Sequence, residues 1–339
     1  MSVIINGTDG VTFNDSSLQG AAASPFGLKN RIINGDMVID QRNAGASVTP
    51  SNNQYITDRW KINFSGNFTC QQNAGSVTPP VGFTNYLGAT STGTNTPTGT
   101  TTYSFVQSIE GYNVADLGFG TANAKTVTLS FWVRSSATGT FGGAIQANAQ
   151  NRSYPFSYTI NSANTWEFKT ITIAGDTTGT WLTTNGIGLN VVLCMGGGAS
   201  YQGTAGAWAS SDLRTVTGQT NALATNGATF YVTGVQLEQN TSATPFERRL
   251  YGQEFINCQR YFQTTARIMP CVITSSTTSR RGYYPRTVTM RATPTETGTQ
   301  GAGGTVSFFG SALNTGIDVD GATANAESNF TNYTASAEL

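Results

Sequence analysis

Histidine is absent from all 339 residues of this chain. Catalytic triads with a histidine base and most catalytic zinc sites depend on this side chain, so those classes of enzyme are excluded. Acid–base catalysis would instead need two carboxylates placed together. The 18 acidic residues are dispersed, and none lies in a recognisable glycosidase context. No catalytic residue is therefore predicted. A glycan depolymerase whose carboxylates converge only in the folded chain is the enzymatic alternative.

Charge is also scarce, at 11% of residues with a formal net charge of zero. Nucleic-acid binding is not expected, because no basic stripe is present to attract phosphates. No apolar run approaches the roughly 20 residues that span a bilayer. The N-terminus also lacks the basic and apolar regions of a secretory signal. Membrane insertion is therefore not expected.

Cysteine occurs four times, at Cys70, Cys194, Cys258 and Cys271, with no spacing typical of a metal or redox site. We expect buried thiols in a protein that folds in a reducing cytoplasm. The segment 318–321, followed by Glu327, resembles a calcium-binding loop. It lacks one ligand position and the flanking helices, so a polar turn is predicted there. No metal and no cofactor are predicted.

Glycine is abundant, with 39 residues, and serine, threonine and asparagine crowd the connections. This composition is typical of many short strands joined by turns. Residues 126–134 alternate most clearly: the odd-numbered apolar residues are predicted to face the core, and the even-numbered ones solvent or a shallow groove. The pattern predicts an all-β fold with a two-sheet sandwich. The expected strands are 31–33 with 37–39, 60–64, 126–134, 168–173, 188–194 and 230–237.

Four regions are predicted along the chain. They are an N-terminal anchoring segment at 1–29, a β-sandwich at 30–247, a linking helix at 248–263 and a smaller C-terminal β domain at 264–339. The segment 1–29 is too short to bury a core by itself, so it is expected to pack against another chain. The helical pattern itself covers about 250–262.

Glycan recognition needs an exposed aromatic ring beside amide, carboxylate or guanidinium groups. Trp132 with Arg134 meets this requirement on the polar face of 126–134, and so do Tyr201 and Trp208 in a long glycine-rich and serine-rich stretch. Each has an alternative: a loop covers Trp132, or Tyr201 and Trp208 fill a subunit interface.

Three arginines near the helix have a structural interpretation. Arg248, Arg249 and Arg260 are predicted to tie the helix to the sandwich through salt bridges with Glu247 or Glu254. Ligand binding by these arginines is the alternative.

Several longer motifs occur in order along the chain: LKNRIINGDMVIDQR at 28–42, YITDRW at 55–60, SIEGYNV at 108–114, VTLSFWVRS at 127–135 and QLEQNTSATPFERRLYGQEFINCQRYF at 236–262. In these segments, the chain resembles the tail-fibre, head-fibre and neck-fibre appendage proteins of tailed bacteriophages. The resemblance implies a jelly roll similar to carbohydrate-binding modules. It also implies a homotrimer that contacts other virion proteins through 1–29, and a location in the virion after assembly in the host cytoplasm.

The jelly roll of carbohydrate-binding modules often holds a structural calcium between its first and last strands. In this chain Asp36 lies near the first strand, but Thr233 stands where an acidic ligand is expected. Asp36 is therefore predicted to be a turn or strand-pairing residue.

Three functions follow from these patterns. The first is a non-enzymatic short fibre that recognises host-surface polysaccharide, and the second is a capsid or collar decoration or connector without glycan binding. The third is the depolymerase.

Overall fold

The computed structural model describes residues 29–272, 280–300, 305–320 and 327–339, together with three short paired strands, β1 (Ile4–Asn6), β2 (Gly10–Thr12) and β3 (Leu18–Gln19). Side chains are described for 29–265, 285–298, 308, 310–314 and 332–339. The predicted packing of 1–29 against a partner lies outside these residues. Within them, no helix is long and apolar enough to cross a membrane.

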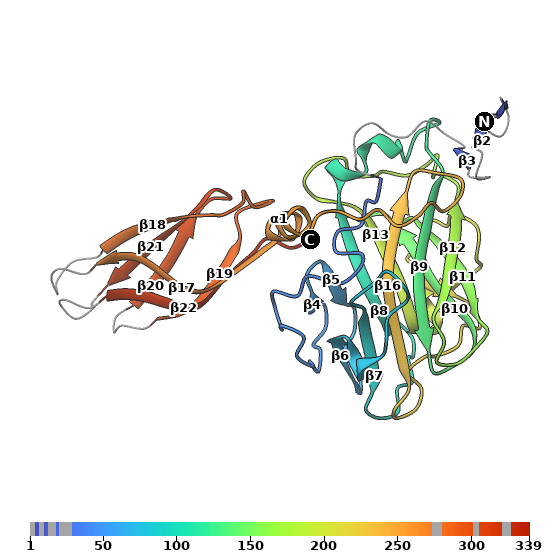
Figure 1. The fold of residues 1–339 in the computed structure, drawn as a ribbon, viewed down its shortest axis with the longest axis horizontal. Coiled ribbons are helices and arrows are strands. Elements are labelled where there is room, and N and C mark those ends of the chain that lie inside the picture. Colours follow the sequence, from blue (N-terminus) through green and yellow to red (C-terminus); the bar gives the residue numbers. More distant parts are fainter. Residues whose placement is uncertain are drawn as a thin grey trace.

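The larger unit is a sandwich of two antiparallel sheets (Figure 1). The six-stranded sheet has the order β11 (Ser153–Ile160), β10 (Gly139–Gln146), β13 (Ile187–Gly197), β8 (Thr102–Glu110), β5 (Trp60–Ile62) and β4 (Tyr55–Thr57). The five-stranded sheet has the order β12 (Glu167–Ile173), β9 (Val127–Ser135), β16 (Thr229–Glu238), β7 (Leu87–Ser91) and β6 (Phe68–Gln72). Shorter elements are η1 (Ala74–Ser76), η2 (Gly111–Asn113), η3 (Ala115–Leu117), η4 (Ala199–Tyr201), β14 (Gln202–Gly203) and β15 (Thr215–Val216).

The core lies between these sheets. Val127, Leu129, Phe131 and Val133 of β9 are fully buried, as their alternation predicts. Trp60 is also fully buried. The predicted all-β sandwich fold is confirmed. Cys70, Cys194 and Cys258 are buried free thiols, as predicted, whereas the side chain of Cys271 lies outside the described residues.

The predicted first strand is wrong. Residues 29–40 form no regular strand, because Asn34 and Met37 have left-handed backbone angles of 57° and 60° that break the extended conformation. Single backbone hydrogen bonds still attach the segment to β16, from Val235 N to Gly35 O at 2.9 Å and from Arg31 N to Leu237 O at 2.8 Å.

The long stretch after β13 packs back onto its own six-stranded sheet. Thr215 and Val216 are buried, and a side chain at Gly142 of β10 would lie 2.4 Å from Thr215 Oγ1. An isolated bridge joins Ser153 to Ala209. These contacts within the chain account for the length of the stretch.

The smaller unit extends away from the sandwich beyond helix α1 (Tyr251–Gln259) (Figure 1). The helix is shorter than predicted, since Phe262 already begins β17 (Phe262–Val272). Two three-stranded sheets follow, with orders β17–β22–β19 and β18–β21–β20. The remaining strands are β18 (Arg280–Pro285), β19 (Thr295–Gln300), β20 (Thr305–Gly310), β21 (Asn314–Asp320) and β22 (Glu327–Ser336). Asp318 and Asp320 belong to β21, so the turn predicted there is a strand.

A buried polar junction joins the two units. The Arg59 guanidinium, 1% exposed, pairs with Glu338 and lies 3.5 Å from the centre of the Tyr261 ring. Arg42 pairs with the same Glu338 carboxylate at 2.7 Å. On the helix side, Arg260 donates to the buried Glu110 at 2.7 Å. The junction therefore draws on β4–β5, β8, the end of α1 and the residues after β22.

Replacing Glu338 with glutamine should destabilise the protein by about 3 kcal/mol, because it leaves the buried Arg59 without a counter-charge. The Arg31–Asp116 pair provides the comparison, since the Asp116 side chain is 54% exposed while that of Arg31 is 10% exposed. Asp116→Asn should cost less than Glu338→Gln, because water reaches the exposed side of this pair. Guanidinium-induced unfolding measures both variants, and equal losses would contradict the importance of the buried pair.

Asp58 gives the junction a dependence on pH. Burial raises the pKa of Asp58 to about 6, against 3.8 in an unfolded chain, although Arg42 and the hydrogen bonds from Gln41 oppose the shift. The Asp58 carboxyl therefore binds its proton more tightly in the folded state than in the unfolded state. Its contribution to the free energy of unfolding falls as pH rises from about 4 to about 6. The loss is up to about 3 kcal/mol. The stability difference between wild type and Asp58→Asn should be larger at pH 4.5 than at pH 7.5; an unchanged difference would contradict the shifted pKa.

Candidate functional site: an aromatic groove on the five-stranded sheet

A bulge in β16 shapes the outer face of the five-stranded sheet. Pairing between β16 and β9 shifts register between Thr233 and Gln236, and Gly234 there has a φ of 61°. A side chain at Gly234 would lie 2.6 Å from Phe83 Cζ and 3.2 Å from Trp132 Cδ1. Glycine at this position therefore allows both rings to approach the strand.

Beside this bulge lies a cavity of about 330 Å³, which we call the aromatic groove. It is lined by Phe83, Ser130, Trp132, Phe168, Gly234, Thr244, Pro245, Phe246 and Arg248. Trp132 of β9 faces Phe168 of β12 across the strand pair, with ring centres 5.4 Å apart. Phe83 and Phe246 form a second ring pair at 5.3 Å. Phe168 is 46% exposed, so the groove is open to solvent.

The indole N–H of Trp132 distinguishes it from the other four tryptophans. Those four donate to backbone carbonyls: Trp60 to Asn34, Trp166 to Thr78, Trp181 to Thr178 and Trp208 to Ala174. Within the described part of the chain, the Trp132 Nε1–H has no such acceptor, and it is not a buried atom. Its N–H is available to a ligand, and its half-buried ring is partly accessible beside Phe168.

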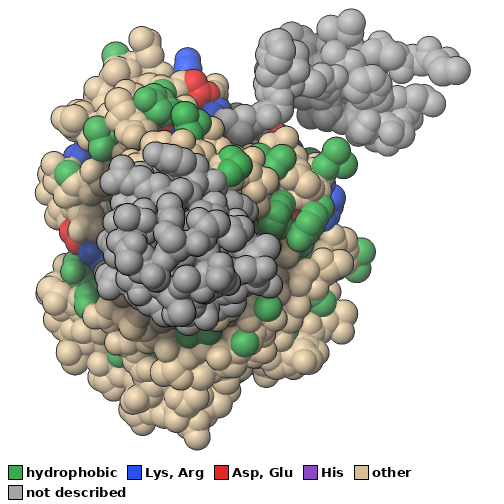
Figure 2. Space-filling view, turned by 90° about the vertical axis from the view of Figure 1, so that its left-hand side faces the viewer, with side chains coloured by type: hydrophobic (Ala, Val, Ile, Leu, Met, Phe, Trp, Pro, Cys, Tyr) green, Lys and Arg blue, Asp and Glu red, His purple; other side chains and the backbone are tan. Residues whose placement is uncertain are grey.

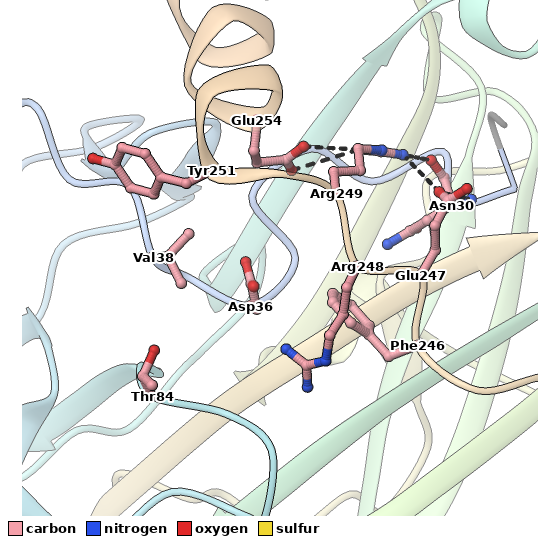
Figure 3. A pocket seen from close by; sticks show the side chains of 10 residues that line it. All are labelled: Asn30, Asp36, Val38, Thr84, Phe246, Glu247, Arg248, Arg249, Tyr251 and Glu254. Carbon is pink, nitrogen blue, oxygen red and sulfur yellow. Dashed lines mark hydrogen bonds and ion pairs between the residues drawn. The ribbon is translucent and has the colours of Figure 1, made fainter.

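A second cavity of about 180 Å³ shares Phe246 and Arg248 with the aromatic groove, and we call it the polar cavity (Figure 3). Its other lining residues are Asn30, Asp36, Val38, Thr84, Glu247, Arg249, Tyr251 and Glu254. Burial raises the pKa of Asp36, and the negative charge of Glu254 raises it further. Backbone hydrogen bonds from Asp36 itself and from Val38, together with the positive charge of Arg248, offset only part of this increase in the pKa.

Ion pairs hold two of the carboxylates in the polar cavity. Glu247 accepts hydrogen bonds from the backbone N–H groups of Lys29 and Asn30 and pairs with Arg249 at 3.1 Å. Glu254 also pairs with Arg249 at 3.1 Å (Figure 3). These contacts fix the segment between β16 and α1 against the start of the sandwich.

Arg248 behaves differently from its neighbours, and the predicted salt bridge is wrong for this residue. Arg249 and Arg260 form ion pairs, although the partner of Arg260 is Glu110. The Arg248 guanidinium instead lies 4.7 Å from the centre of the Phe83 ring and 5.6 Å from that of Phe246. Both residues precede the helix, and Figure 3 shows the Arg248 and Arg249 side chains pointing in opposite directions.

The structure places the four predicted glycan-binding residues in different surroundings. Trp132 lines the aromatic groove, whereas Arg134 donates to Asn164 O at 2.9 Å and lies over the Tyr231 ring, outside the groove lining. Tyr201 packs beneath the Arg214 guanidinium at 4.1 Å. The Trp208 ring packs edge-on against Phe119, Tyr154 and Trp181. Only Trp132 of the four lines the aromatic groove.

Three groove residues were not predicted from the sequence to bind a ligand, Phe83, Phe168 and Phe246, and for Arg248 ligand binding was the alternative to a salt bridge. The position of Phe168 could have been predicted, because alternation along β12 places it on the outer face of the sheet, where it pairs with Trp132. Phe83 and Phe246 lie in connections far apart in the sequence, and no local pattern pairs them. Thr233, at the position considered for calcium, donates its hydroxyl to Asn85 O at 2.7 Å and, at 3.4 Å, to Asp36 O.

An additional cavity of about 270 Å³ lies on the six-stranded sheet. Its lining is rich in amides and includes Asn63, Gln146 and Asn190 with Lys61. Gln146 already donates to Asp212 and Leu213, and Lys61 to Leu339. It has no aromatic residue in its lining, so it lacks the stacking surface that the aromatic groove provides.

No protein-family model and no curated protein matches this chain. Solved structures similar to it include the enzymatically active domain of bacteriophage CBA120 tailspike protein 4, with a TM-score of 0.33 and 12% identity over 62% of this chain and 21% of that chain. A putative sugar-binding protein from Bacteroides thetaiotaomicron has a TM-score of 0.37 and 11% identity, covering 62% of this chain and 100% of the other.

Carbohydrate-binding modules also occur among these structures. The family 11 module from Clostridium thermocellum has a TM-score of 0.28 and 12% identity, covering 58% of this chain and 98% of the module. These matches cover only part of this chain.

Gly234→Ala should destabilise the protein by roughly 2 to 4 kcal/mol. Strain at a positive φ accounts for about 1 kcal/mol, and contact with Phe83 and Trp132 adds the rest. Gly206 is the matched control, because its φ is 90° and no atom lies within 4 Å of an added side chain. Gly206→Ala should cost only about 1 kcal/mol in urea unfolding. Equal losses in the two variants would mean that the rings do not press on the bulge.

Proposed function

We propose that this chain is a non-enzymatic structural protein of a tailed-phage virion, a short tail, neck or head fibre that binds host-surface glycans through the aromatic groove. The observation that carries the glycan part is Trp132, whose N–H has no acceptor among the described residues and whose half-buried ring lies beside the exposed Phe168. Sugars present an apolar C–H face to such rings and hydroxyls to nearby donors. The homotrimer and the virion contacts of 1–29 belong to this proposal through the sequence resemblance.

The surface chemistry supports a fibre. Neutral polar side chains and backbone cover most of the visible face of the sandwich, and charged side chains are few (Figure 2). Such a surface has little electrostatic attraction for polyanions in general, so recognition would depend on a shaped site and on several copies acting together.

Trp132→Ala should weaken binding to a recognised polysaccharide roughly tenfold or more, because the stacked ring is lost. Affinity electrophoresis against purified capsular and O-antigen polysaccharides measures this directly. Tyr112→Ala is the control, since Tyr112 is an aromatic residue outside the groove and 62% exposed. It should bind like the wild type.

The same experiment separates the alternatives. Wild-type binding that Trp132→Ala leaves unchanged would remove the groove from the site. Binding to no polysaccharide would favour a decoration or connector role. Release of reducing ends during incubation would identify a depolymerase; of the carboxylates that line the polar cavity, Glu247 and Glu254 pair with Arg249, and Asp36 forms no ion pair with any described residue.

A further inference from the structure

We propose that Arg248 selects a carboxylate-bearing sugar, such as a uronic acid, at the end of the aromatic groove where it meets the polar cavity. This inference rests on the proposed glycan binding and names the class of ligand that the groove prefers. Arg248 is the one charged side chain in the lining of the aromatic groove. A ligand carboxylate is the natural counterpart of a guanidinium, since two parallel hydrogen bonds can form.

Comparison with the other arginines shows how unusual Arg248 is. Arg31, Arg42, Arg59, Arg152, Arg214, Arg249, Arg260 and Arg286 form ion pairs. Arg134 and Arg291 donate to backbone carbonyls. Among the arginines whose side chains the structure describes, Arg248 alone has neither kind of partner. Its five N–H donors are therefore free to bind a ligand.

The guanidinium is nevertheless held in place. It stacks near Phe83 and Phe246, and a side chain at Gly82 would lie 3.2 Å from its Nη2. The residues on either side, Glu247 and Arg249, are anchored to each other and to Asn30. The two ring contacts restrict the exposed guanidinium and so reduce the side-chain entropy that it loses when a ligand binds.

The nearby acidic side chains determine on which side of Arg248 a ligand carboxylate would lie. Asp36 interacts electrostatically with Arg248 and lines the polar cavity, but it is absent from the lining of the aromatic groove. Glu247 and Glu254 are both paired with Arg249. A ligand carboxylate would therefore lie on the aromatic side of Arg248, and sugar hydroxyls would face Asp36 as their acceptor.

The test measures binding of the full chain to polygalacturonate, alginate, hyaluronan and polysialic acid, and to the neutral form of each in which the carboxyl groups have been reduced. The purified capsular polysaccharides are tested in the same way. At least one acidic form should bind about 10- to 100-fold more tightly than its neutral form, because one charge-assisted contact is lost on reduction. Arg248→Gln should abolish that preference. Arg134→Gln, the matched control outside the groove, should retain it, and added salt should weaken only the acidic form.

Two results would overturn the inference while leaving glycan binding intact: Trp132-dependent binding of neutral and acidic forms with equal affinity, or an acidic preference that survives in Arg248→Gln. Asp36→Asn adds a third criterion, since removing this charge should leave acidic binding equal or stronger. A loss of acidic binding in Asp36→Asn would contradict the proposed orientation. Failure of every polysaccharide to bind would overturn the proposed function as well.

Discussion

The arrangement of this molecule depends on one buried cation. Arg59 lies where the sandwich, the helix and the residues after β22 meet, and its charge is balanced by Glu338. A buried guanidinium is costly without a partner, so the paired arrangement strongly disfavours separation of the two units. Arg42, from the loop before β4, shares the same carboxylate and couples that loop to the junction.

The junction and the groove are parts of one connected structure. The segment between β16 and α1 is fixed by Glu247, Arg249 and Glu254, and Glu254 belongs to the helix that leads into the junction. Because both neighbours of Arg248 are anchored in this way, its side chain can project into the groove without a partner of its own. Arg248 is exposed, so water solvates its guanidinium and the lack of a protein partner costs little.

The repeating features of the fold were predictable, and the groove was largely not. Strict alternation in 127–133 identified the core face of β9, because a strand repeats every two residues. The motif residues Arg42, Arg59, Glu110 and Arg260 were visible in the sequence, but their convergence on one junction needs contacts more than 100 residues apart. The groove likewise brings Phe83 beside Phe246, and neither loop carries a periodic signal.

Arg248 and Arg249 are adjacent in the sequence, yet the sequence did not predict their different roles. Both belong to the same charged triplet, and the sequence predicts a salt bridge with Glu247 or Glu254 for each of them. The helix begins at Tyr251, so both arginines precede it, and Figure 3 shows their side chains pointing apart. Arg249 forms ion pairs with Glu247 and Glu254, whereas Arg248 lines the aromatic groove. Arg248 is thereby the one charged side chain that lines the aromatic groove.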